Sequence, residues 1–215
     1  MTIADLNSWF LYLACAVLGY LLGNVQFAVI ISRLKYKDDV RNHGSGNAGS
    51  TNMLRVFGLS SGLITFLGDL LKGILGVLIG RWIAGEVGGY ICALFVVLGH
   101  DFPVFLRFKG GKGVAASLGV IWMIRPLYGL AVTLAAVVLI LLFQIISVAS
   151  MAGSALFLLL ALIFDWGNWP LVALAFLLWA LIMVRHWENI LRLARGEENK
   201  FSLRSKNGAP PNGKK

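Results

Sequence analysis

The chain of 215 residues is 58% hydrophobic, has only 13% charged residues and has a mean hydropathy of +0.79. These values exclude an ordinary soluble domain and predict a protein of the lipid bilayer. The formal net charge is +9, but the basic residues stand between apolar blocks, so we exclude nucleic acid as a partner and interpret them as topology signals and anion ligands.

The chain begins with a long apolar block rather than a cleavable leader. The first five residues include no basic residue, and the block is longer than the apolar core of a signal peptide. We therefore expect the block to remain as a membrane span. Cys15 and Cys92 lie inside apolar runs without metal-ligand spacing. Neither a disulfide framework, a metal site nor a cofactor is predicted.

The apolar blocks predict an all-α, polytopic integral membrane protein, because a helix satisfies its own backbone hydrogen bonds in lipid. We expect seven transmembrane helices, at Trp9–Ile31, Gly62–Trp82, Gly88–Phe105, Val114–Trp122, Leu127–Ser150, Gly153–Phe164 and Trp169–Val184. The fourth and sixth of these are short, so a count of five remains open.

The basic residues predict the orientation of these helices. Most of the 19 Lys and Arg residues fall after the first, third and last predicted spans. Positively charged loops stay in the cytoplasm, so we expect the N-terminus outside and the C-terminus in the cytoplasm. The predicted organisation is a single transmembrane domain at residues 1–195, followed by a polar cytoplasmic tail at 196–215 that we expect to be disordered.

A first glycine-rich loop, residues 44–52, follows the first predicted span. It reads Gly-Ser-Gly-Asn-Ala-Gly-Ser-Thr-Asn and is followed by Arg55. Glycine lets the backbone approach a ligand closely, and successive N–H groups can surround phosphate oxygens. The loop also matches the dinucleotide-binding pattern formally, but no βαβ unit is available, so that fold is excluded. The alternative interpretation is a flexible loop or a helix cap.

A second glycine-rich loop, residues 108–113, lies a few positions after His100. It reads Phe-Lys-Gly-Gly-Lys-Gly and leads into a predicted span. A glycine turn at a helix start, with Lys112 beside it, favours an anion. The loop is not a nucleotide-binding P-loop, because Gly113 stands where that motif requires Ser or Thr. A basic cytoplasmic loop and a buried structural histidine are the alternatives for Lys109 and His100.

Two further polar groups stand at or inside predicted spans. His186 and Asn189 are three residues apart and would share a helix face that contacts an anion. Helix capping and interfacial anchoring are the alternatives. Asp69 and Lys72 are also three apart, inside an apolar block, and we expect them to form a structural ion pair, with direct ligation by Lys72 as the alternative.

Together these motifs resemble the bacterial acyl-phosphate:glycerol-3-phosphate acyltransferase family, in their order and over nearly the whole chain except the tail. The resemblance implies a seven-helix acyltransferase of the bacterial cytoplasmic (inner) membrane, with its active site on the cytoplasmic side. Such an enzyme makes lysophosphatidic acid from acyl phosphate and glycerol 3-phosphate in phospholipid biosynthesis. Membrane lipid and the enzyme that makes acyl phosphate are the further expected partners.

The candidate substrate- and phosphate-binding residues are Ser45, Gly46, Asn47, Gly49, Thr51, Asn52, Arg55, Lys72, His100, Gly110, Gly111, Lys112, Gly113, His186 and Asn189. The resemblance implies that five of them, Ser45, Arg55, Lys112, His186 and Asn189, surround the phosphates. It implies that five others shape the first glycine-rich loop, namely Gly46, Asn47, Gly49, Thr51 and Asn52. Acyl phosphate is already activated, so the enzyme must chiefly neutralise two anions and align a hydroxyl. We expect a phosphate oxygen to take the hydroxyl proton, with His186 as the alternative base and Asn189 as a second catalytic candidate.

Two other classes of function, a transporter and a scaffold, fit the sequence less well. A transporter for organic phosphates would need ligand groups on both sides of the membrane, and the predicted outer loops lack a matching cluster. A scaffold subunit would leave the Gly, Ser, Asn and Lys side chains of the loops unexplained. No His-x4-Asp pair occurs in the chain, which excludes the other large glycerolipid acyltransferase family.

Overall fold

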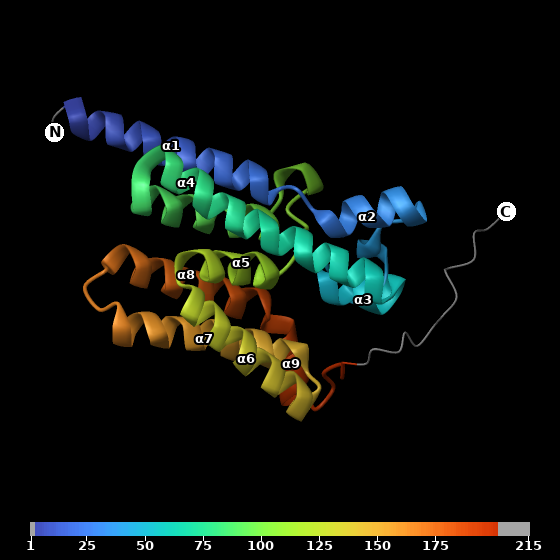
Figure 1. Ribbon diagram of the computed structural model, residues 1–215. Coiled ribbons are helices and arrows are strands. Elements are labelled where there is room, and N and C mark those ends of the chain that lie inside the picture. Colours follow the sequence, from blue (N-terminus) through green and yellow to red (C-terminus); the bar gives the residue numbers. More distant parts are fainter. Residues whose placement is uncertain (1–2, 202–215) are drawn as a thin grey trace.

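The computed structural model describes residues 3–201, and side chains from residue 8 onward. The helices are α1 (Ile3–Gly23), α2 (Phe27–Tyr36), α3 (Ser50–Phe57), α4 (Leu59–Asp101), α5 (Val114–Ile124), α6 (Pro126–Phe143), α7 (Ile146–Phe164), α8 (Trp169–Arg185) and α9 (Trp187–Ala194), with 3-10 turns η1 (Val40–Asn42) and η2 (Val104–Leu106). Residues 3–201 contain no strand, which agrees with the predicted all-α class (Figure 1).

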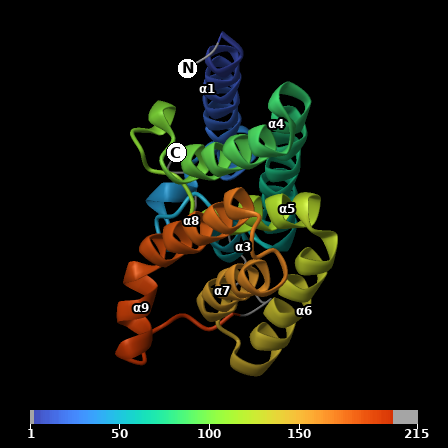
Figure 2. The same ribbon diagram turned by 90° about the vertical axis from the view of Figure 1, so that its left-hand side faces the viewer.

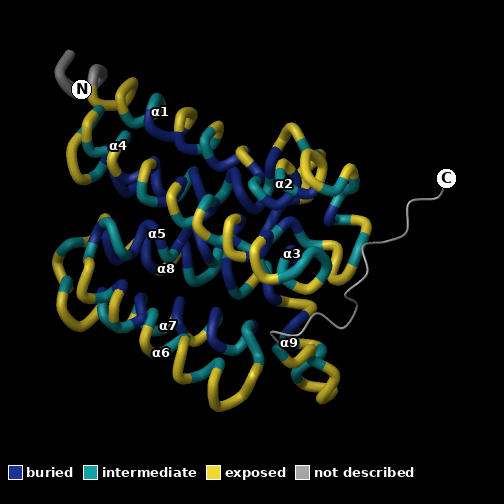
Figure 3. Tube along the Cα trace, turned by 45° about the vertical axis from the view of Figure 1, so that its right-hand side comes forward, coloured by how far each residue is buried: buried dark blue, intermediate teal, exposed yellow. Residues whose placement is uncertain are grey.

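Several of these helices are suited to lipid. Four described segments are long and apolar enough to cross a membrane, and the number is five if α8 and α9, which meet at 58°, form one span. Large apolar side chains such as Leu141 (74% exposed) and Trp82 (88% exposed) point outward, whereas buried residues gather on the inner sides of the helices (Figure 3). Such a surface is stable only in an apolar solvent, so the chain is a multi-pass membrane protein. The count of seven spans stays a prediction.

Helix α4 contains a sharp turn. Ala84 and Gly85 leave helical geometry, and Gly85 has φ 65° and ψ −159°, a conformation that favours glycine. Figure 1 shows the chain reversing there, beside the start of α1. The turn separates the predicted spans Gly62–Trp82 and Gly88–Phe105, which lie along the two arms of α4, although the second was predicted to continue past the end of α4 at Asp101.

Two predicted boundaries were wrong. The predicted span Trp9–Ile31 is broken between α1 and α2, where the side-chain amide of Gln26 donates to the carbonyl oxygens of Gly23 (3.1 Å) and His100 (3.0 Å). The predicted turn between Leu127–Ser150 and Gly153–Phe164 lies earlier, at Gln144, which has φ 57°. Because this turn uses no glycine or proline, the apolar pattern concealed it.

Small residues let the helices of the bundle pack closely. A Cβ atom added at Gly23 of α1 would lie 2.2 Å from the carbonyl oxygen of Val96 in α4, and one added at Gly73 would lie 2.1 Å from that of Ala116 in α5. In lipid, close packing of this kind takes the place of the hydrophobic effect in joining helices. These crossings hold α1, α4 and α5 together.

The polar loops lie toward one end of the bundle. Helices α2, α3 and α9 are at that end, and the start of α1 is at the other (Figure 1). Figure 2 shows α9 turning away from the axis of α8. The fold therefore brings the segments around the two glycine-rich loops and the α8–α9 junction toward one side.

Candidate active site

A cavity of about 1540 Å³ opens at the end that carries α3 and α9. Its polar part is lined by Ser45, Thr51, Arg55, Lys112, His186 and Asn189, and its deeper part by apolar side chains of α4 to α8. Within the described residues, no group of His, Cys, Asp or Glu side chains is arranged to hold a metal ion. The cavity is thus cationic at one end and apolar at the other.

The cavity brings together most of the candidate residues. Those that line it are Ser45, Asn47, Gly49, Thr51, Asn52, Arg55, His100, Lys112, Gly113, His186 and Asn189. The other candidates, Gly46, Lys72, Gly110 and Gly111, do not line it. Stretches more than a hundred residues apart in the sequence therefore face one chamber.

Asn52 shapes the first glycine-rich loop from within. Its buried amide nitrogen lies within hydrogen-bond distance of three backbone carbonyl oxygens, those of Val40 (3.1 Å), His43 (3.0 Å) and Asn47 (3.1 Å). Its Oδ1 accepts the N–H of Ser45 at 3.0 Å. Gly44 and Gly46 have φ of 59° and 70°, which lets the chain curl around this side chain. The polar atoms of Asn52 are thus engaged with the protein, so this residue sets the shape of the loop.

Two exposed polar side chains belong to this region, Ser45 within the loop and Arg55 just after it. Both line the cavity, and among residues 8–201 no carboxylate forms an ion pair with Arg55. The first residues of α3, Ser50 and Thr51, line the same part of the cavity. An unpaired guanidinium and the N-terminus of a helix, which line the same cavity here, both favour the binding of an anion.

The second glycine-rich loop packs against His100. The N–H of Gly111 donates to the carbonyl oxygen of His100 at 3.0 Å, and a Cβ atom at Gly111 would lie 1.9 Å from Nε2 of that histidine. From the other side, Nε and Nη2 of Arg185 donate to the carbonyl oxygen of Gly111 at 3.1 Å and 2.7 Å. These contacts fix the backbone just before Lys112.

Lys112 links the second glycine-rich loop to α9. Its ammonium donates to Oδ1 of Asn189. Burial, together with the nearby charges of Arg192 and Arg185, lowers the pKa of Lys112 to about 8, against the opposing effect of Glu198 and Glu188. Below that pH the side chain is a partly desolvated cation, which attracts a phosphate more strongly than a hydrated surface lysine does.

Sequence reasoning missed Glu198. Its carboxylate accepts from Nδ2 of Asn189 (2.6 Å), Nε of Arg192 (2.8 Å) and Oγ of Ser147 (3.0 Å). The bond to Nδ2 turns Oδ1 of Asn189 toward Lys112. Glu198 stands alone at the start of a polar segment, and no sequence pattern there distinguishes a glutamate that supports a site from one that is exposed to water. Residues 202–215 of the predicted tail lie outside the described residues.

His186 stands between α8 and α9. Its Nδ1 lies 2.8 Å from the carbonyl oxygen of Ile182. Because a carbonyl oxygen only accepts, Nδ1 carries the proton, and Nε2 of the neutral ring is an acceptor. His186 and Asn189 both line the cavity, although the two helices meet at 58°.

Lys72 does not line the cavity, although its partners Asp69 and His100 do, and its ammonium binds the backbone at the break between α1 and α2. The predicted ion pair with Asp69 is confirmed, with 2.9 Å between Nζ and Oδ1. The same ammonium donates to the carbonyl oxygens of Gly23 (3.2 Å) and Val25 (2.8 Å). Carbonyl groups released by a broken helix need such partners inside a membrane.

Known proteins similar to this chain share one description. The chain matches the family model described as "Glycerol-3-phosphate acyltransferase" over residues 13–196. A glycerol-3-phosphate acyltransferase of Thermoanaerobacter pseudethanolicus is 41% identical over 190 residues, which cover 88% of this chain and 96% of the relative. Glycerol-3-phosphate acyltransferase 2 of Bacillus anthracis is 41% identical over 187 residues, covering 86% and 96%.

Two crystal structures of PlsY (YgiH), described as an integral membrane glycerol 3-phosphate acyltransferase, have a similar fold. The glycerol 3-phosphate form has a TM-score of 0.83 and 38% identity, and the lysophosphatidic acid form has 0.80 and 36%. Each comparison covers 89% of this chain and 96% of the other.

Replacement of Asn52 by alanine is expected to loosen the first glycine-rich loop, because buried backbone groups lose their partner at a cost of about 1–3 kcal/mol each. Hydrogen exchange of the purified protein in detergent should show faster exchange at residues 44–49. Asn42, an exposed asparagine in the adjoining turn, provides the control, and Asn42→Ala should exchange like the unmodified chain. Equal exchange in the Asn52→Ala and unmodified proteins would count against this role.

Proposed function

Because the chain belongs to the glycerol-3-phosphate acyltransferase family, we propose that it transfers the acyl group of acyl phosphate to glycerol 3-phosphate. The products are lysophosphatidic acid (1-acyl-glycerol 3-phosphate) and inorganic phosphate. The reaction is a step of phospholipid biosynthesis.

The observation that carries this proposal is the division of one cavity into a cationic and an apolar part. Arg55 and Lys112 line the first part, and apolar side chains of several helices line the second. Acyl phosphate and lysophosphatidic acid both combine a phosphate with a long apolar chain. Glycerol 3-phosphate has the phosphate alone, so it suits the cationic part. The cavity therefore matches both substrates and the lipid product.

The length of the apolar part supports a long-chain acyl donor. The cavity lining extends from Val132 of α6 to Gln144, which follows that helix directly, and from Ile146 to Phe157 of α7. At the rise of an α-helix each stretch is about 17 Å long. One leaflet of a bilayer has about 15 Å of hydrocarbon, so an ordinary membrane acyl chain fits this length.

Catalysis at this site consists of alignment and charge neutralisation. The hydroxyl oxygen of glycerol 3-phosphate attacks the acyl carbon, the bond from that carbon to the phosphate oxygen breaks, and the hydroxyl proton passes to a phosphate oxygen. Arg55 and Lys112 offset the repulsion between the two phosphate groups. The N–H groups at the starts of α3 and α5 are further donors. Nε2 of His186 is the alternative acceptor for the proton.

We also propose that the chain crosses the bacterial cytoplasmic membrane seven times, with the two arms of α4 counted separately. The N-terminus is then outside, and the polar part of the cavity is cytoplasmic. Basic residues at the cavity end of the bundle support this orientation, because positively charged segments stay in the cytoplasm. The transmembrane domain comprises residues 1–195, and Glu198 from the following segment contributes to the site.

The direct test uses the purified full-length protein with palmitoyl phosphate and radiolabelled glycerol 3-phosphate. We expect labelled lysophosphatidic acid in the lipid extract, and loss of at least about 99% of the rate in Lys112→Ala, the scale of one buried charge contact in a transition state. Palmitoyl-CoA in place of palmitoyl phosphate should give no product. Absence of product with either donor, together with counterflow of glycerol 3-phosphate in liposomes, would favour a transporter instead.

The pH dependence tests the state of Lys112. Because the pKa of this lysine is about 8, its charge is present below that pH and is lost above it. The value of kcat/KM for glycerol 3-phosphate should therefore fall above about pH 8, rather than near the pKa of about 10.4 of an ordinary lysine.

Lys112→Arg is the matched variant for this experiment. Arginine keeps its charge throughout the range, so the fall near pH 8 should disappear, whatever the absolute rate. Initial rates need correction for spontaneous hydrolysis of the acyl phosphate. A fall at the same pH in both proteins would assign the titration to another group.

A further inference from the structure

The turn that leads into the second glycine-rich loop has a backbone that L-residues rarely adopt. Arg107 (φ 55°) and Phe108 (φ 60°) are consecutive non-glycine residues in the left-handed region. Such strain persists only where the surroundings hold the backbone in place. Both side chains are exposed, so their own packing does not provide that support.

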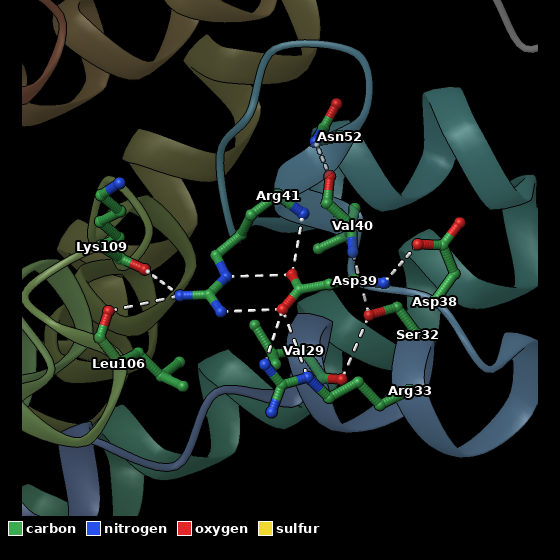
Figure 4. A network of polar contacts seen from close by, with 10 residues as sticks. All are labelled: Val29, Ser32, Arg33, Asp38, Asp39, Val40, Arg41, Asn52, Leu106 and Lys109. Carbon is green, nitrogen blue, oxygen red and sulfur yellow. Dashed lines mark hydrogen bonds and ion pairs between the residues drawn. The ribbon is translucent and has the colours of Figure 1, made fainter.

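The guanidinium of Arg41 lies against this strained turn. Its Nη1 donates to the carbonyl oxygen of Leu106 at 3.3 Å and to that of Lys109 at 3.4 Å. The two acceptors stand immediately before and after Arg107 and Phe108 in the chain. Figure 4 shows both carbonyl groups directed at the same side of the guanidinium. One side chain therefore holds both ends of the strained pair.

The opposite side of the guanidinium is paired with Asp39. Nε of Arg41 donates to Oδ1 at 3.0 Å, and Nη2 donates to Oδ2 at 2.8 Å. Hydrogen bonds from Arg41 hold the pKa of Asp39 well below its usual range, so the carboxylate is charged at any working pH. A two-point pair of this kind fixes the plane of the guanidinium.

The turn that carries Arg41 is itself fixed to two helices. The N–H of Val40 donates to Oγ of Ser32 in α2 at 3.2 Å, and its carbonyl oxygen accepts from Asn52 of α3 at 3.1 Å (Figure 4). The Val40 side chain is fully buried. Arg41 thus extends from a fixed base and adds two side-chain hydrogen bonds to the turn, whose own backbone bonds include Phe108 N–H to the carbonyl oxygen of Pro103 at 2.9 Å.

We propose that Arg41 is a positioning residue, which holds the turn 106–109 against the first glycine-rich loop and thereby places Lys112. Only two glycines separate Lys109 from Lys112, so the contacts of Arg41 with the turn and those of His100 and Arg185 with Gly111 together hold the backbone that leads to the lysine. Arg41 does not line the cavity, so it acts through the backbone of the second loop. The kinetic consequence rests on the proposed acyltransferase function, whereas the contact with the turn does not.

Arg33 provides a matched control for Arg41. It pairs with the same carboxylate of Asp39 at 2.8 Å, but its side chain is 55% exposed. Among the described residues it donates no hydrogen bond to the turn 106–109. Arg33→Gln and Arg41→Gln therefore each remove one positive charge beside Asp39, and only Arg41→Gln removes the support of the turn.

The first test measures hydrogen exchange of the full-length protein in lipid nanodiscs. Arg41→Gln should speed exchange at residues 106–113 by at least about tenfold, while α4 and α5 exchange as in the unmodified protein. Arg33→Gln should leave residues 106–113 unchanged. With Arg41→Lys, the exchange rate at residues 106–113 should lie between those of the other two variants. An ammonium lacks the planar fork with which a guanidinium contacts two carbonyl oxygens and a carboxylate at once. Unchanged exchange in Arg41→Gln, or an equal increase in Arg33→Gln, would overturn the proposal.

The second test measures steady-state kinetics with palmitoyl phosphate and glycerol 3-phosphate. Arg41→Gln should raise KM for one or both substrates by about tenfold, the scale of one charge-assisted hydrogen bond to a phosphate, with a smaller change in kcat. A fall in kcat at constant KM would mean a smaller folded fraction and would reject the positioning role. An unmodified protein without activity would reject the proposed function, and the exchange experiment would still decide the role of Arg41.

Discussion

The hydrogen bond between Lys112 and Asn189 is the contact on which the candidate site depends, because it joins the loop before α5 to the helix after α8. Other side chains fix the position of both partners. The amide of Asn189 is oriented by Glu198, which is also paired with Arg192. The backbone beside Lys112 is fixed through the carbonyl oxygen of Gly111. A cation held in this way has little conformational freedom left to lose, so in the proposed reaction binding energy would go into alignment of the substrates.

Contacts from the interior of the membrane domain reach the same loop. Lys72 occupies the break between α1 and α2 and contacts Nδ1 of His100 at 2.7 Å. The carbonyl oxygen of His100 in turn accepts from Gly111. The irregular backbone between α1 and α2 is therefore coupled to the second glycine-rich loop through two side chains. A buried ion pair is costly in lipid, and this coupling explains why one occurs here. Lys72, held by the pair, provides a hydrogen-bond donor for the carbonyl groups left free where α1 breaks from α2.

The sequence predicted the all-helical class and the segments that line the candidate cavity, but it did not locate the supporting contacts of Glu198 and Arg41. Glycine-rich loops next to Arg55 and Lys112 signal anion chemistry, because residue type alone carries that signal. The resemblance placed Asn52 among the residues that shape the first loop, and its hydrogen bonds are indeed made to the backbone of that loop and of the turn before it. In the sequence, Arg41 is one of the basic residues that indicate the membrane orientation. Its contacts are with residues 65 and 68 positions further along the chain, which a local pattern does not reveal. The turn at Gln144 lacks glycine and proline, so an apolar pattern could not locate it.

Chemical labelling of lysines tests the convergence of these stretches most directly. Acetic anhydride at neutral pH labels Lys112 and the exposed Lys109 of the same loop, and mass spectrometry measures both. Glycerol 3-phosphate at ten times its Kd should lower labelling of Lys112 by about tenfold and leave Lys109 unchanged, and Arg55→Gln should abolish this protection at the same ligand concentration. Equal labelling of Lys112 with and without ligand, or full protection in Arg55→Gln, would contradict a shared phosphate site.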